Sequence, residues 1–263
     1  MLTYIILGII QGFTEPIPIS SSGHLILFKH LLNVPVLNDL NFEIFSNFGS
    51  FLAIFIIFRK DIIKILKNSY IYTKTKDKKY KFEFNFLILI ILGTIPAGII
   101  GLLFNNFIEN TMTNIKYIGI SLIITSIFLF LIRKQEGYKT KNNITKKDAF
   151  KIGLFQAVAL FPGISRSGAT IVGGIFNKLT KKAAFNFSFM LYIPITIATL
   201  LLKIKDITSI NSHLLLNYLI GTIFSFITTL ISLKWFKNII IKGKLIYFVY
   251  YCLIVGLLVI IFL

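Results

Sequence analysis

The chain has 263 residues, of which 56 % are hydrophobic and only 14 % are charged, and its mean hydropathy is +0.81. Soluble domains carry about 25 % charged residues, so this composition excludes an ordinary soluble protein and predicts one embedded in a lipid bilayer. The net charge of +18 raises nucleic-acid binding as an alternative, but 23 of the 28 basic residues lie in four short segments, namely 59–81, 133–151, 178–182 and 234–244. Basic short loops face the cytoplasm, so we expect contacts with membrane lipids and no nucleic-acid partner.

The first apolar segment, residues 2–31, is interrupted in the middle. Pro16 and Pro18 prevent a regular helix there, because proline lacks an N–H group and disfavours helix at the preceding residue. The serines that follow, Ser20 to Ser22, are preferred N-cap residues, so a second helix is predicted to begin at this point. Residues 2–31 are therefore predicted to form a hairpin of two short helices.

Six later segments are continuous and apolar enough to cross a bilayer, which takes about 20 helical residues. They are 42–58, 84–104, 115–132, 184–203, 214–233 and 245–263. Between the third and fourth of these spans lies segment 150–176, which is broken by Pro162 and Gly163 and restarts at Ser165. This segment has the same plan as residues 2–31.

The two broken segments also share a sequence. A shift of 145 residues superimposes Gly8 on Gly153, Gln11 on Gln156, Ser20 on Ser165, Ser22 on Ser167 and Gly23 on Gly168. Three crossings separate the copies, so they would enter the membrane from opposite sides and meet near its midplane. We expect an all-α polytopic membrane protein in which an inverted-topology repeat supplies two re-entrant broken-helix hairpins beside about six full transmembrane helices. Residues 1–263 would form a single integral membrane domain, with repeat 1 at about 1–132 and repeat 2 at about 146–263.

Two charged residues, Glu15 and Arg166, lie inside these apolar segments, where an ionised side chain costs about 2.5–3.5 kcal/mol or more. Two predicted helix N-termini face each other there, with Arg166 beside one of them, and a helix N-terminus carries free N–H donors that attract phosphate. Arginine can also grip phosphate oxygens in a bidentate fork. The pattern indicates an anion site. Two alternatives remain open: the charges form a structural ion pair, or they lie near the surface on irregular backbone.

The segments Gln11–His24 and Pro162–Thr170 closely resemble the two signature motifs of the undecaprenyl-diphosphate phosphatase family, which are integral membrane enzymes associated with bacitracin resistance. Phe42-Glu43 and residues 49–53 resemble the same family more weakly. The family's acidic motif permits Glu or Gln at the position of Gln11, so Glu15 is the only carboxylate that this motif supplies here.

The resemblance implies that a C55 polyprenyl diphosphate is hydrolysed to the monophosphate and inorganic phosphate, which recycles the cell-wall lipid carrier. It also implies a bacterial cytoplasmic (inner) membrane protein. Loop charge would place the active site on the outer face. An inverted repeat with broken helices is equally typical of a transporter or a lipid flippase, and a structural membrane scaffold is a third class. A homo-oligomer is left open.

By match to the motif, Ser21 is the candidate nucleophile and Glu15 or His24 the group that removes its proton. Arg166 would neutralise phosphate charge. On chemistry alone, water activated by a divalent cation (Mg²⁺ or Ca²⁺) bound at Glu15 is an equal contender. Further substrate-binding candidates are Gln11, Ser165, Ser167, Gly168, Thr170, Ser22 and Gly23, although Ser22 and Ser167 are more typical of helix caps. Glu43 is expected to be an interfacial charge.

Overall fold

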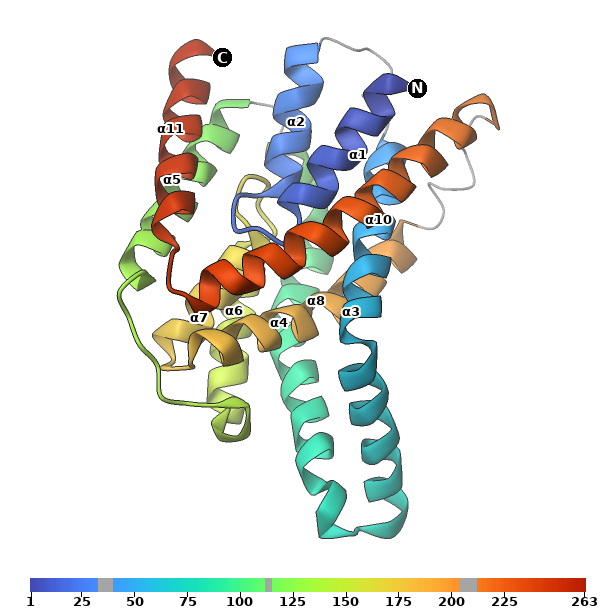
Figure 1. Cartoon of the computed structure of the whole chain (residues 1–263), viewed down its shortest axis with the longest axis vertical. Helices are drawn as coiled ribbons and strands as arrows, with labels where there is room; N and C mark the ends of the chain where they lie inside the picture. The colour runs from blue at the N-terminus through green and yellow to red at the C-terminus, as the bar shows by residue number, and fades with distance from the viewer. Residues whose placement is uncertain (33–39, 112–114, 204–211) are drawn as a thin grey trace.

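A computed structural model describes residues 1–32, 40–111, 115–203 and 212–263 (Figure 1). Ten α-helices are described in these ranges, together with two short 3₁₀ turns at Lys78–Tyr80 and Lys141–Asn143. The helices are α1 (Leu2–Thr14), α2 (Ser21–Leu32), α3 (Leu40–Thr75), α4 (Lys81–Thr111), α5 (Ile115–Ile132), α6 (Lys146–Val158), α7 (Arg166–Phe176), α8 (Lys181–Leu202), α10 (Ser212–Ile241) and α11 (Ile246–Phe262). The prediction of an all-α chain is confirmed for the described residues.

Five of the six predicted spans correspond to helices that are long and apolar enough to cross a membrane, within α3, α4, α5, α8 and α10. The sixth, predicted at 245–263, is α11, a shorter apolar helix of 17 residues at the lower end of spanning length. Large apolar side chains such as Leu103, Leu216 and Ile231 are more than half exposed on these helices. Exposed apolar surface on this scale suits lipid rather than water, and the chain is a multi-pass membrane protein.

Residues 69–81, in the basic segment 59–81 that its charge predicts to be a cytoplasmic loop, are mostly helical, so this prediction is wrong. α3 continues to Thr75 and has 36 residues, about 54 Å of helix against a hydrocarbon core of about 30 Å. In Figure 1 the end of α3 and the start of α4 project together from the rest of the molecule. Nζ of Lys64 lies 3.3 Å from Oε1 of Glu83, and the ring centroids of Tyr72 and Phe84 are 4.9 Å apart. These contacts between the two helices explain why the helical structure continues through a basic segment.

Both hairpins break where proline and glycine predict a break. α1 ends at Thr14, just before Pro16, and α6 ends at Val158, just before Pro162 and Gly163. Gly163 has φ +88, a backbone conformation that residues with a Cβ rarely adopt, so the turn needs glycine there. In Figure 1 the α1–α2 turn (blue) and the α6–α7 turn (yellow) lie side by side in the middle of the molecule, where the side chain of Ser165 reaches the backbone of Ile17.

Helix packing between the two halves is reciprocal. α1 packs against α10, and a Cβ on Gly8 would lie 2.3 Å from the carbonyl oxygen of Gly221. α6 packs against α4 in the same way, and a Cβ on Gly153 would lie 2.4 Å from the carbonyl oxygen of Gly93. Gly8 and Gly153 are the residues that the 145-residue shift pairs. This exchange of contacts supports the repeat, whose bounds and opposite insertion stay predictions.

Candidate active site

The two turns touch each other directly. The hydroxyl groups of Ser165 and Ser167 both donate to the carbonyl oxygen of Ile17, at 3.4 and 3.3 Å. Contacts between the motifs are again reciprocal: a Cβ on Gly168 would lie 3.1 Å from Cβ of Pro18, and one on Gly23 would lie 3.2 Å from Cα of Gly163. The close approach of two helix starts, at Ser21 and at Arg166, follows from this packing.

A small polar cavity of about 70 Å³ lies between these helix starts. It is lined by Glu15, Ser20, Ser21, Ser22, Glu43, Asn47, Ala159, Ile164, Ser165 and Arg166. Five of the residues singled out from the sequence therefore share one cavity, although they come from both halves of the chain: Glu15, Ser21, Ser22, Ser165 and Arg166. A second polar cavity of about 120 Å³ shares the walls formed by Glu43, Asn47 and Arg166 and extends towards Lys203.

Glu15 is held by hydrogen bonds from both sides of the break. The Ser21 hydroxyl donates to Oε2 of Glu15 at 2.5 Å, and Nε2 of Gln11 donates to the same oxygen at 2.8 Å. Gln11 also donates to Oδ1 of Asn47 at 2.7 Å. Gln11 is buried and lies behind Glu15 rather than on the cavity wall. Its amide therefore orients the carboxylate, and direct contact with substrate stays a prediction for it.

Arg166 lies across the cavity from this network. Its Nη1 donates to the hydroxyl of Thr196 at 3.0 Å, and its guanidinium carbon lies 5.1 Å from the centre of the Tyr192 ring. Among the described residues no carboxylate oxygen lies within 4.0 Å of its nitrogens. The alternative of a structural Glu15–Arg166 ion pair is therefore not what the structure shows. The two charges face a common space and leave room between them.

The remaining predicted residues build the turns around the cavity. Ser165 caps α7 by accepting the N–H of Gly168 at 3.1 Å, and Ser20 accepts the N–H of Gly23 at 3.3 Å. The other N–H groups at a helix start have no partner within the helix, and such ends are therefore suited to bind an anion. Thr170 is buried, 2.5 Å from the hydroxyl of Ser188, and lies behind the cavity.

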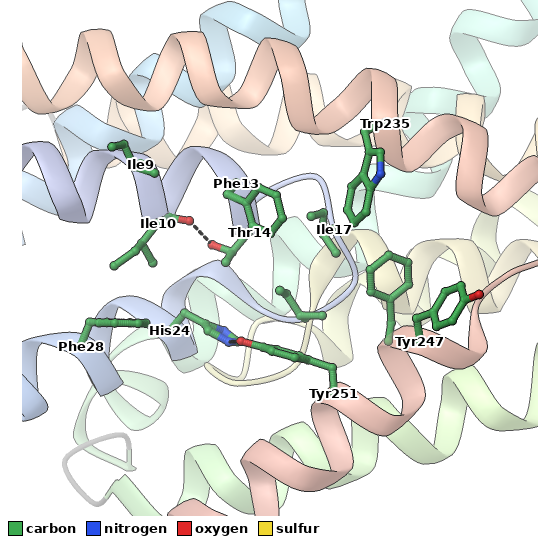
Figure 2. Close-up of a pocket in the computed structure, with 12 residues that line it drawn as sticks. Ile9, Ile10, Phe13, Thr14, Ile17, His24, Phe28, Trp235, Tyr247 and Tyr251 are labelled. Carbon is green, nitrogen blue, oxygen red and sulfur yellow. Dashed lines mark hydrogen bonds between the residues drawn. The ribbon is translucent and has the colours of Figure 1, made fainter.

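His24 does not line this cavity. It lies on the other side of the α1–α2 turn, on the wall of a larger apolar cavity of about 400 Å³ that is bounded by α1, α2, α10 and α11 (Figure 2). Its Nδ1 is 2.7 Å from the carbonyl oxygen of Ser20, and its Nε2 is 2.7 Å from the hydroxyl of Tyr251. The structure thus gives Ser21 one neighbouring base, Glu15, and places the imidazole elsewhere.

Sequence reasoning missed four residues at the site. Glu43, expected at the membrane surface, lines both polar cavities together with Asn47. Their spacing of four residues puts them on one helix face, a signal that the sequence did contain. Tyr192 and Thr196 share the same spacing on α8. The Tyr192 hydroxyl is buried near Glu15, Arg166 and Thr196 but forms no well-aligned hydrogen bond with described residues.

The oxygen atoms that line the cavity also indicate which cation could bind there. No group of three His, Cys, Asp or Glu side chains that could hold a metal occurs within the described ranges. The cavity does offer the carboxylates of Glu15 and Glu43 and the amide oxygen of Asn47. Oxygen ligands of this kind suit Mg²⁺ or Ca²⁺ rather than zinc. A divalent cation here therefore fits the chemistry of the residues and stays a proposal.

Comparison with known proteins gives a consistent picture over the full length. The family described as "Bacitracin resistance protein BacA" matches residues 4–258. The chain is 48 % identical to "Undecaprenyl-diphosphatase 2" of Bacillus thuringiensis (strain Al Hakam), over all of this chain and 98 % of that protein. It is 44 % identical to "Undecaprenyl-diphosphatase" of Oceanobacillus iheyensis, over 99 % of this chain and 96 % of that protein. The chain therefore belongs to the BacA bacitracin resistance family.

Proposed function

We propose that the chain hydrolyses undecaprenyl diphosphate to undecaprenyl phosphate and inorganic phosphate at the Glu15–Arg166 cavity. The family match and the names of the relatives support this reaction. The observation that carries it for this chain is the short hydrogen bond from the Ser21 hydroxyl to Glu15, in a cavity that also contains a guanidinium without an ion-pair partner among the described residues. A hydroxyl, a base and a cation are the groups that phosphoryl transfer requires.

In the reaction we infer, Oγ of Ser21 attacks the terminal phosphorus while its proton moves to Glu15. The bond from that phosphorus to the bridging oxygen breaks, and undecaprenyl phosphate leaves with the bonding electrons. The proton on Glu15 then passes to the leaving phosphate, which restores the carboxylate. Water then attacks the phosphorus of the phosphoserine while Glu15 takes its proton, and the bond from phosphorus to Oγ of Ser21 breaks. The proton on Glu15 passes to Oγ, which regenerates the Ser21 hydroxyl and releases inorganic phosphate.

Arg166 and the two helix starts stabilise the charge of the phosphoryl group in this scheme. Thr196 and the ring of Tyr192 hold the guanidinium, and Arg166 lines the cavity in which the non-bridging oxygens would lie. Two helix N-termini add about half a positive charge each. A divalent cation held by Glu15 and Glu43 would add Lewis-acid stabilisation when bound.

A phosphate-release assay on purified protein in detergent tests the proposal. We expect turnover of undecaprenyl diphosphate, and a decrease in kcat of at least about a thousandfold in Glu15→Gln, because both half-reactions lose their base. Glu136→Gln, which makes the same change on an exposed loop, is the matched control and should behave as wild type. Absence of phosphate release by the wild-type protein, or normal turnover in Glu15→Gln, would contradict the proposal.

Transport of an anionic lipid is the second candidate function, because reciprocal broken helices are also a transporter architecture. Transport needs Arg166 and the helix starts, but it gives no role to a Ser21 hydroxyl aimed at a carboxylate. A vesicle assay with fluorescent polyprenyl phosphate separates the two functions. Lipid movement that persists in Ser21→Ala while phosphate release is lost would establish transport as a separate activity.

We further propose that the protein lies in the bacterial cytoplasmic membrane with its active site open to the outside. Support comes from the basic segments, all of which fall on one side if the six spans cross as predicted. Position 38 precedes α3 in the sequence and position 78 follows it, so Asn38→Cys and Lys78→Cys test its two sides, and the native Cys252 is buried. An impermeant maleimide should label position 38 in intact cells and position 78 only after permeabilisation. The reverse pattern would overturn the orientation.

A further inference from the structure

A chain of three hydrogen-bonded residues lies on the side of the α1–α2 turn that faces away from the catalytic cavity. The Tyr251 hydroxyl is 2.7 Å from Nε2 of His24, and Nδ1 of His24 is 2.7 Å from the carbonyl oxygen of Ser20. The rings of His24 and Tyr251 also stack, with centroids 5.5 Å apart and an interplanar angle of 15° (Figure 2). Tyr251 belongs to α11, so this chain connects the C-terminal helix with the turn that carries Ser21.

These contacts define the protonation of the imidazole. A carbonyl oxygen can only accept, so Nδ1 of His24 must carry the hydrogen that it shares with Ser20. The residues that line the surrounding cavity include no carboxylate to balance a second proton, so Nε2 is the acceptor and the Tyr251 hydroxyl donates to it. The only basic atom of His24 is therefore already occupied and faces the apolar cavity. His24 cannot accept the proton of Ser21 without losing its hydrogen bond with the Tyr251 hydroxyl.

The carbonyl that His24 holds belongs to an unusual residue. Ser20 has φ +69, in the left-handed region that residues other than glycine rarely adopt. The second motif provides an internal comparison, because the 145-residue shift pairs Ser20 with Ser165 and His24 with Ala169. Ser165 caps its helix with φ −69, an ordinary extended conformation. The left-handed serine thus occurs in the copy with the imidazole and not in the copy with alanine.

We propose that Tyr251 is a positioning residue for the reaction: through His24 it holds the carbonyl of Ser20 in the left-handed turn that directs the next residue, Ser21, at Glu15. The Ser21–Glu15 hydrogen bond of 2.5 Å is the contact that this arrangement preserves. The inference rests on the proposed function, in which Ser21 is the reacting group. It assigns to His24 a positioning role in place of the proton-transfer role expected from the motif.

Tyr251→Phe is the direct test, because it keeps the stacked ring and removes only the hydroxyl. We expect kcat to decrease about tenfold, the effect of losing one hydrogen bond that acts on the reacting group, with KM within about twofold of wild type. The matched control is Tyr247→Phe: Tyr247 lines the same cavity one turn earlier on α11, but its side chain is exposed and no hydrogen bond joins it to His24 in the described part of the chain (Figure 2). Equal activity in wild type and Tyr251→Phe would overturn the proposal.

Two substitutions of His24 separate positioning from proton transfer. The side-chain nitrogen of asparagine occupies the place of Nδ1, whereas that of glutamine occupies the place of Nε2. If His24 acts by holding Ser20, His24→Asn keeps the essential hydrogen bond and should retain at least about tenfold more activity than His24→Gln. Equal inactivation of both variants, at equal melting temperature, would instead indicate proton transfer and overturn the inference.

The tautomer can be measured without any turnover. In protein labelled with ¹⁵N-histidine, which contains three histidines, the His24 signals are identified by their loss in His24→Asn. They should show the Nδ1–H tautomer, with an Nε2 signal that shifts in Tyr251→Phe and not in Tyr247→Phe. An Nε2–H tautomer would exclude the contact with Ser20. Because this readout needs no substrate, it stays informative if the proposed reaction itself fails.

Discussion

Ser21 and Glu15, which lie on opposite sides of the break between α1 and α2, are joined by a hydrogen bond of 2.5 Å. Pro16 and Pro18 create the break, and the serine begins the helix that follows it. A continuous helix would place residues six positions apart on different faces. The interruption of the helix is therefore what brings the proposed nucleophile and the proposed base together.

Replacement of this serine gives the first prediction. Ser21→Ala should reduce phosphate release by at least about a thousandfold, because it removes Oγ, the atom proposed to attack the phosphorus. Rapid quenching of wild-type protein with labelled substrate should trap phosphate on Ser21. Thr73→Ala removes an exposed hydroxyl from the projecting end of α3 and should leave activity unchanged. Substantial activity in Ser21→Ala, without a trapped phosphoserine, would favour attack by water.

The guanidinium gives the second prediction. Arg166→Lys keeps the charge but loses the planar fork and the fit over the Tyr192 ring, so KM should rise about tenfold and kcat fall at least as much. The same substitution at Arg133, in a basic loop, should have no effect on either constant. Steady-state phosphate release at several substrate concentrations distinguishes the two effects. Unchanged kinetics in Arg166→Lys would exclude contact with the phosphoryl group.

The sequence predicted the helices and the break points because these depend on local chemistry. Apolar runs of spanning length, proline at the break and serine at the restart each act over a few residues. The convergence of Glu15 and Arg166 followed from the repeated motif. What the sequence under-predicted was the length of α3, because its basic end is stabilised by pairing with α4, as in the contact between Lys64 and Glu83.

The orientation of the His24 side chain could not be predicted from the sequence. It lies three residues after Ser21, which on a helix suggests a shared face. The structure turns the imidazole instead towards Tyr251, 227 residues further along the chain. Tyr192 was missed for the same reason, since only the packing of α8 against α7 brings it near Arg166. Contacts between distant helices decide both cases.

The glycine contacts give a prediction on stability. In Gly8→Ala and Gly153→Ala the new methyl group would meet a backbone oxygen at 2.3 and 2.4 Å, so α1 and α6 must move away from α10 and α4. We expect destabilisation of about 1–3 kcal/mol or more, seen as a lower melting temperature in detergent. Gly98→Ala, where nothing lies within 4 Å, is the control and should gain up to about 1 kcal/mol from helix propensity. Equal melting temperatures in all three variants would contradict the reciprocal packing.

The start of α6 gives a prediction on pH. Asp148 completes a capping box with Thr145, and its carboxylate accepts from Nζ of Lys139 at 2.9 Å. Burial disfavours the charge of this carboxyl, but the hydrogen bonds from Thr145 and Lys139 outweigh burial and lower the pKa of Asp148 below its usual value. A carboxyl whose pKa is lower in the folded state stabilises the fold above its unfolded pKa of about 3.9, and that contribution is lost as pH falls through the folded pKa.

Asp148→Asn should therefore melt about 2–4 °C below wild type at pH 7, and the two melting temperatures should converge as the pH is lowered from about 5 towards 3. Convergence follows because acid removes from the wild type the same charge that the substitution removes at every pH. Asp61→Asn is the matched control, since Asp61 is exposed and lies 3.8 Å from Lys141. Exposed pairs contribute little, so its melting curve should follow wild type throughout. A difference between Asp148→Asn and wild type that stays constant from pH 7 to pH 3 would mean that packing of the side chain, rather than its charge, stabilises the start of α6.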